Sequence, residues 1–192
     1  FSVEQFTREL VVQSLDSSYA SGSDLNRVYP RIRHWQTAWW QYTMTSPDLL
    51  RNRIALALSE IFVVSEVPQL EEYPLALANY YDMLLDNAFG NFRDLLYDVT
   101  MHPAMGVYLT HVNNPKANPA TNQFPDENYA REVMQLFSIG LYELHPDGSQ
   151  KLDSLNNPIP TYDITDIENL ARFFTGLSYG DAFLFFGEPL SE

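Results

Sequence analysis

The stretch that most constrains this fold is residues 124–140, FPDENYAREVMQLFSIG, which has the pattern of a capped amphipathic helix. Pro125 and Asp126 are typical of a helix start, where a fixed φ and a negative charge are both favoured. Gly140 favours a stop, because glycine adopts the left-handed backbone that follows many last turns. At about 100° per residue, polar and apolar side chains separate onto two faces. We therefore expect a helix over residues 126–139, called the central helix below.

The polar face of the central helix carries a dense group of ionisable side chains. It contains Glu127, Asn128, Arg131, Glu132, Gln135 and Ser138. Glu127 and Arg131 are four residues apart, so their side chains can meet. One interpretation is a solvated face with an ordinary ion pair, which contributes about 0.3–0.5 kcal/mol. The other is a cleft, in which Glu127 or Glu132 is a base or metal ligand and Arg131 binds an anion or fixes a carboxylate. The spacing fits both interpretations.

The rest of the chain contains further segments in which apolar residues recur with the period of a helix, and residues typical of helix starts and stops flank them. Proline, aspartate, serine and asparagine stand at most of the expected starts. Further helices are expected over residues 2–15, 27–44, 46–65, 74–87, 92–101, 103–112 and 165–175. A linker is expected over residues 67–72, and Thr165 with Glu168 has the spacing of a capping box. The buried side of the 46–65 helix is expected to contain Leu50, Ile54, Leu58, Ile61 and Phe62.

Residues 141–163 lack the helical pattern. They contain two turn-forming groups, Pro146-Asp147-Gly148 and Asn156-Asn157-Pro158, which favour an extended or hairpin segment. The apolar residues 183–186 are a short candidate strand. Because the connections between helices are short, neighbouring helices are expected to pack together. We predict a mostly α fold, with one bundle-like helical domain over residues 1–192 and a small extended insertion at about residues 141–163.

Composition excludes several classes of function. The chain has 192 residues and is 45% hydrophobic, which is enough for a sizeable core. Its net charge of −14 argues against nucleic acid as a partner. The lack of cysteine removes disulfides, thiolate metal sites and thiol nucleophiles. No apolar run reaches the roughly 18 residues of a transmembrane helix. The chain also lacks the GxGxxG, phosphate-loop, GxSxG and HExxH motifs, which argues against nucleotide enzymes, common serine hydrolases and common zinc proteases.

The polar loop NNPKANPATNQ leads directly into the central helix. Loops beside a helix start are frequent binding elements, so Asn113, Lys116 and Asn128 are candidate binding residues. Lys116 and the helix N-terminus favour an anionic ligand. Asp126 and Glu127 oppose an anion and favour a cation that is also held by loop carbonyls.

Histidine and tryptophan side chains outside the central helix each have two interpretations. His102 stands before a proline at a helix junction, where it is either a functional histidine or a structural one that caps a helix or bonds a carbonyl. Trp35, Trp39 and Trp40 form an aromatic cluster. Such a cluster packs in a core in most proteins, and in others it holds a sugar or a cofactor ring.

Several segments, in order, resemble a bacterial family known as domain of unknown function 1800 (DUF1800). The segment FPDENYAREVMQLFSIGLYELHPDG is similar to the family segment PNENYARELLELFTLG. The other matching segments are LRNRIALALSEIFVVS, HPAMGVYL, NPKANPAT and IPTYDITDIENLARFFTG. The resemblance covers roughly residues 47–180. It implies a helical fold, and it implies no particular reaction because the activity of the family is unassigned.

The resemblance also implies a biological setting. Family members are longer bacterial proteins with an export signal, so the chain is expected to be a fragment of a protein located in the periplasm, at the cell surface or outside the cell. Genes of a second secreted family often lie nearby, which points to a protein partner. Many members carry a WHNHF-like histidine motif where this chain has Glu60, and Phe137 replaces another histidine. These replacements argue against a histidine metal site in this chain. Glu60 is then either a metal ligand or acid/base group, or a carboxylate paired with an arginine such as Arg53 or Arg131. With Glu132 from the polar face, it is a candidate ligand of a divalent metal ion.

Two functions follow from these observations. The first is an exported or envelope-associated binding or structural module, which is favoured because no catalytic motif is complete. The second is an exported enzyme, metal-dependent or working by carboxylate acid/base chemistry, with its site on the polar face of the central helix. Its candidate catalytic residues are Glu127, Arg131, Glu132 and His102.

Overall fold

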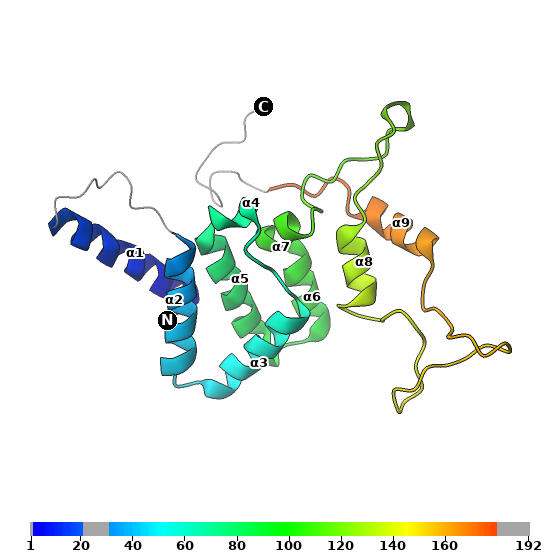
Figure 1. The fold of residues 1–192 in the computed structure, drawn as a ribbon, viewed down its shortest axis with the longest axis horizontal. Coiled ribbons are helices and arrows are strands. Elements are labelled where there is room, and N and C mark those ends of the chain that lie inside the picture. Colours follow the sequence, from blue (N-terminus) through cyan, green and yellow to red (C-terminus); the bar gives the residue numbers. More distant parts are fainter. Residues whose placement is uncertain (1, 21–30, 180–192) are drawn as a thin grey trace. The chain divides into compact units, whose positions relative to one another are not determined.

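We describe the fold from a computed structural model, in which residues 2–20 and 31–179 are placed (Figure 1). The described residues form nine α-helices and no β-sheet, so the predicted mostly α class is confirmed. The chain divides into two compact units, the first ending at Tyr108 and the second beginning at Leu109. Each unit is described by itself, and the single domain expected from the sequence stays a prediction.

The first unit is built around α5. Its helices are α1 (Val3–Ala20), α2 (Ile32–Thr45), α3 (Leu49–Ile61), α4 (Pro68–Glu71), α5 (Pro74–Asp86), the short 3-10 helix η2 (Asn87–Phe89), α6 (Phe92–Met101) and α7 (Pro103–Tyr108). Helix α5 contacts α1, α2, α3, α4 and α7 (Figure 1). Leu77, Tyr80 and Leu84 of α5 are fully buried, and burial of one such side chain contributes about 1.5–3 kcal/mol. Ala76 and Ala78 let neighbouring backbones approach closely.

Side chains close the exposed starts of helices in the first unit. Asp48 and Asn91 accept backbone N–H groups at the starts of α3 and α6, at 3.2 and 2.8 Å. The start of α1 is closed from another helix, because the carboxylate of Asp82 on α5 accepts the N–H groups of Val3 and Glu4 at 2.7 and 2.9 Å. These contacts satisfy backbone donors that have no partner within their own helix.

The second unit contains a pair of packed helices and a core of aromatic side chains. Its elements are the 3-10 helix η3 (Pro119–Thr121), α8 (Asn128–Gln135) and α9 (Ile164–Phe173). Helix α8 packs against α9. The buried ring of His111 is stacked on Tyr129 at a centroid distance of 3.9 Å, and Phe174 meets Tyr129 edge-on at 5.0 Å. Phe137 completes this core, with its ring 6.2 Å from Tyr129.

The chain between α8 and α9 makes the extended excursion that the sequence predicts (Figure 1). Three short segments in it meet through backbone hydrogen bonds. Lys151 donates to Glu143 at 2.8 Å, Ile159 donates to Lys151 at 3.0 Å, and Glu143 donates to Ile159 at 2.9 Å. The two turns between these segments have a positive φ at Gly148 and at Asn156, residue types that accept this backbone readily.

Several local expectations are wrong in detail. The central helix is shorter than predicted, since α8 covers eight residues, although Gly140 ends the segment with a φ of 76° as expected. The predicted linker at residues 67–72 contains the helix α4. Asp163, with Asp166, forms the capping box of α9, in place of the predicted pair that began at Thr165. Leu50 and Ile61, which were expected in the core, are exposed on α3.

Other expectations fall outside the described residues. They are the strand at residues 183–186 and the first residues of the 27–44 helix.

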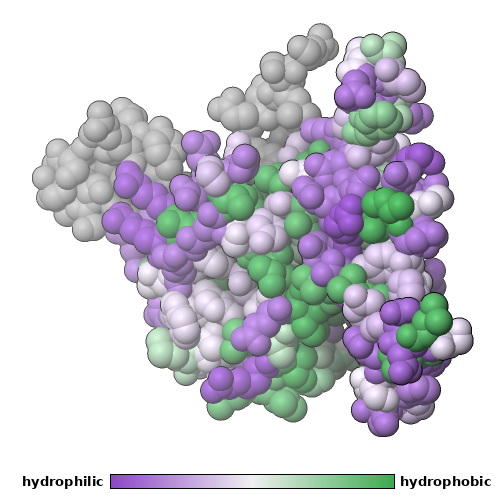
Figure 2. Space-filling view, turned by 45° about the vertical axis from the view of Figure 1, so that its right-hand side comes forward, coloured by the Kyte–Doolittle hydropathy of each residue, from purple (hydrophilic) through white to green (hydrophobic). Residues whose placement is uncertain are grey.

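Apolar side chains also reach the molecular surface. Figure 2 shows hydrophobic areas between hydrophilic ones. The large exposed side chains of the first unit include Trp40, Met44 and Tyr97. Among the described residues, no helix combines the length and the apolar character needed to cross a bilayer.

Candidate functional site

The polar face of α8 is a solvated helix surface for most of its length. Glu127 and Arg131 form the predicted ion pair, with 2.7 Å between the Glu127 Oε2 and Arg131 Nη2 atoms. The Glu127 side chain is 33% exposed to solvent and the Arg131 side chain is 44% exposed. Asn128 is exposed too, and its amide donates to the Thr110 hydroxyl at 3.0 Å. The structure therefore brings together three of the residues predicted for this site, and it leaves them in contact with water.

Glu132 differs from its neighbours on α8. Its Oε2 atom is buried, and none of the described residues donates a hydrogen bond to it. A buried carboxylate oxygen without a donor costs free energy. Glu132 is therefore the least solvated of the three predicted catalytic residues on and beside α8, which are Glu127, Arg131 and Glu132.

The loop before α8 is held by an asparagine that the sequence did not single out. Asn114 is 3% exposed, and its amide bonds the backbone of Asp126 in both directions, donating to the carbonyl at 3.1 Å and accepting from the N–H at 2.8 Å. The predicted binding residue Asn113 accepts a bond from the Ser178 hydroxyl at 2.7 Å, and Lys116 is exposed. Two adjacent asparagines gave no local signal of which one would be buried.

His102 belongs to the first unit and has a structural arrangement. Its Nδ1 atom accepts the N–H of Ala104 at 3.2 Å, which closes the start of α7. Its Nε2 atom lies 3.1 Å from the side-chain oxygen of Asn79, and its ring meets Tyr80 edge-on at 5.0 Å. Burial lowers the pKa of His102 to about 4, although the negative charge of Asp98 raises it. At neutral pH this ring is neutral with both nitrogens engaged.

The two candidate metal ligands fall in different units. Glu60 is exposed on α3 in the first unit, and Glu132 lies on α8 in the second. Within residues 2–20 and 31–179, no three histidine, aspartate or glutamate side chains are grouped so that they could hold a metal ion.

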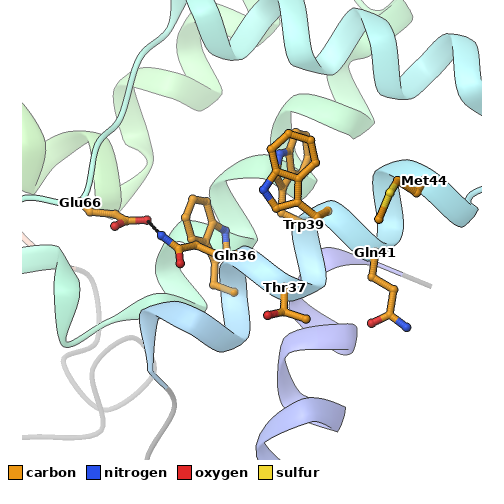
Figure 3. A pocket seen from close by; sticks show the side chains of 8 residues that line it. Gln36, Thr37, Trp39, Gln41, Met44 and Glu66 are labelled. Atoms are coloured by element: carbon orange, nitrogen blue, oxygen red, sulfur yellow. Dashed lines mark hydrogen bonds between the residues drawn. The ribbon is translucent and has the colours of Figure 1, made fainter.

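An open groove of about 850 Å³ runs along α2 in the first unit (Figure 3). It contains all three tryptophans of the chain. Trp35 and Trp39 are almost fully buried and pack on Tyr81, with centroid distances of 5.5 and 4.4 Å. Trp40 lines the same groove and is 62% exposed. The cluster therefore joins two core side chains to one that is open to solvent.

Polar groups border the aromatic part of this groove. The amide of Gln36 donates to the Glu66 carboxylate at 2.8 Å (Figure 3). Glu66 precedes α4, so two distant parts of the chain form the groove. Burial raises the pKa of the Tyr81 hydroxyl, a hydrogen bond from Ser59 opposes this, and the charge of Glu66 raises it further. The negative charge of Glu66 therefore acts on Tyr81, the ring on which Trp35 and Trp39 pack.

One local pattern in the sequence coincides with the groove. Gln36, Trp40 and Met44 are spaced by four residues, which places them on one helix face. A tryptophan and a methionine in such a row are unusual for a solvated face. Glu66 had no signal, because its contact with Gln36 spans 30 residues.

The sequence was compared with protein families to find those to which this chain is related. The profile of the family described as "Protein of unknown function (DUF1800)" matches residues 4–188. The chain belongs to the DUF1800 family. The match covers both the groove of α2 and the polar face of α8, so membership of DUF1800 does not favour one over the other as the functional site. No curated protein and no solved structure matches the chain.

Proposed function

We propose that this DUF1800 chain is part of an exported or envelope-associated bacterial binding module, with the groove of α2 as its ligand site. The observation that carries the proposal is the gathering of all three tryptophans in one open groove. Its volume lies within the roughly 300–1,000 Å³ of common ligand pockets. An exposed indole beside amide and carboxylate groups offers both an apolar surface and hydrogen-bond partners.

The surroundings of the other candidate residues support binding over catalysis. Glu127 and Arg131 form an exposed pair, and such pairs are common on helix surfaces with no role in a reaction. His102 has both ring nitrogens engaged within the first unit. A general acid or base needs a nitrogen that reaches its substrate, so the geometry of His102 favours a structural role.

The ligand site is tested with the fluorescence of the groove itself. Because every tryptophan of the chain lies in the groove, a shift in indole emission reports binding there. We expect at least one compound class, in a panel of saccharides, amines, amino acids, nucleosides and fatty acids, to give saturable shifts that Trp40→Ala weakens. Tyr97→Ala is the matched control, because Tyr97 is 64% exposed and lies outside the groove. A panel without any Trp40-dependent binding would refute the proposal.

The cellular setting is a separate part of the proposal. It rests on the family resemblance, which implies a longer exported bacterial protein and a second secreted protein encoded nearby as partner. The net charge of −14 supports a protein or small-molecule partner over nucleic acid. Fractionation of the native host should find the full-length protein outside the cytoplasm. A pull-down from the envelope fraction should recover the neighbouring secreted protein.

Glu132 supports a second candidate function, a carboxylate acid/base or metal-dependent enzyme. Its buried oxygen without a partner is the supporting observation, since functional carboxylates are often held in such surroundings. The test is elemental analysis of the full-length protein, purified without chelator, beside Glu132→Gln. A near-stoichiometric divalent metal that the variant loses would support this function. A metal content that is the same in both proteins would count against Glu132 as a ligand.

A further inference from the structure

The described lining of the α2 groove carries a negative charge. It includes the carboxylate of Glu66, and no lysine or arginine of residues 2–20 and 31–179 belongs to it. Within the described part of the chain, the hydrogen-bond partner of the Glu66 carboxylate is the neutral amide of Gln36. The chain as a whole carries a net charge of −14. A charge of this sign attracts cations and disfavours anions at the groove.

The aromatic side chains of the groove add an attraction of the same sign. The face of an indole ring is negative, and tryptophan is the side chain that binds organic cations best. Trp40 is largely exposed to solvent, and Trp35 and Trp39 line the same groove. Met44 adds a soft apolar side chain, which suits the methyl groups of an alkylammonium ion.

We propose that the ligand of this groove is an organic cation of the alkylammonium class, held between the indole of Trp40 and the carboxylate of Glu66. The inference rests on the proposed binding function and names its ligand chemistry. A neutral sugar would use the indole and the amides but would gain nothing from the charge of Glu66. The charge complementarity of the groove therefore favours the cation.

The test compares choline with its neutral isostere, 3,3-dimethylbutan-1-ol, by NMR of the full chain. The three indole N–H signals all come from the groove, so they follow occupancy directly. Titration at low ionic strength extends to about 50 mM, because a small exposed site of this kind binds in the millimolar range. We expect saturable shifts with choline and at least about fivefold weaker binding of the neutral alcohol. Raising the salt concentration should weaken the binding of choline and leave the binding of the neutral alcohol unchanged.

Substitutions test separately the two groups that are proposed to hold the cation, the Glu66 carboxylate and the Trp40 indole. Glu66→Gln and Trp40→Ala should each weaken choline binding by about fivefold. Glu71→Gln removes the same charge from an exposed position on α4, and Tyr97→Ala removes an exposed ring outside the groove. Both controls should keep the wild-type affinity. Loss of affinity in Glu71→Gln equal to that in Glu66→Gln would overturn the role of Glu66, because net charge alone would then explain binding.

The remaining outcomes separate this inference from the proposed function. Sedimentation with phosphatidylcholine vesicles shows whether the same trimethylammonium group is taken from a lipid headgroup or from a free molecule, and binding to either source supports the inference. Equal affinity for choline and the neutral alcohol overturns it. Binding of a disaccharide that depends on Trp40, with none of choline, overturns it and leaves the proposed function standing. If no compound moves the indole signals, both proposals fail.

Discussion

Protonation of His102 should destabilise the first unit below pH 6.5. The ring is neutral in the fold, because Nδ1 accepts the N–H of Ala104 and burial disfavours the charged form. The pKa of His102 is about 4 in the folded protein, against the usual 6.5 for an accessible imidazole. A lowered histidine pKa means that the unfolded chain binds a proton more readily. Stability is therefore fully present above pH 6.5 and is lost as the pH falls toward 4.

The size of this loss follows from the two pKa values. Linkage gives a cost of about 0.2 kcal/mol at pH 7, about 2 kcal/mol at pH 5 and about 3 kcal/mol when the pH falls below 4. The free energy of unfolding should therefore drop by about 2 kcal/mol between pH 7 and pH 5 because of this one residue. Urea denaturation followed by circular dichroism at pH 7, 6 and 5 measures the drop.

A pair of variants isolates the contribution of His102. His102→Asn keeps an acceptor for the N–H of Ala104 but has no ring to protonate, so its loss of stability between pH 7 and pH 5 should be smaller than that of the wild type by about 2 kcal/mol. His145→Asn removes an exposed histidine from the extended excursion and should keep the wild-type pH dependence. If His102→Asn and the wild type lose the same stability over this range, the reasoning is wrong.

Three further substitutions test contacts that the structure identifies. Asn114→Ala removes both bonds to the backbone of Asp126 and should cost about 2–3 kcal/mol, whereas Asn169→Ala at an exposed site of α9 should change stability by less than about 0.5 kcal/mol. Tyr80→Phe deletes a buried hydroxyl that donates to a backbone carbonyl at 2.8 Å, and thermal unfolding should show a loss of about 1–2 kcal/mol. Gly140→Ala meets no neighbouring atom within 4 Å, so its expected cost of about 1 kcal/mol comes only from the positive φ, and a neutral effect in urea denaturation would contradict that.

The sequence predicted helix positions well where one local signal acted alone. Asn91 caps the helix over residues 92–101, which begins and ends where it was expected. It failed where two local patterns competed. Asp163 and Thr165 both have an acidic residue three positions later, and either pair fits a capping box. The choice of Asp163 depends on where the extended excursion returns to α9, which no local pattern contains.

Burial was harder to predict because tertiary neighbours decide it. On α3, Leu50 and Ile61 are exposed while Asn52 is buried, with its amide bonded to the backbone of Asp48 at 2.7 Å. Periodicity predicts that one side of a helix is buried, but the packing of other helices decides which residues lie at its edges. His111 shows the same limit. Nothing near it in the sequence indicates that its ring stacks on Tyr129, 18 positions away.

The tryptophan cluster shows how the two interpretations from sequence can both hold. Core packing and ligand binding were alternatives for the cluster as a whole, and the structure shows that core packing accounts for two of its three tryptophans. Trp35 and Trp39 satisfy the first by packing on Tyr81. Trp40 gains no such burial and leaves a large apolar surface in water, which costs free energy compared with a polar side chain at the same position. The exposure of Trp40 in the groove that Glu66 also lines is therefore the feature on which the proposed binding function rests, because packing within the first unit does not require it.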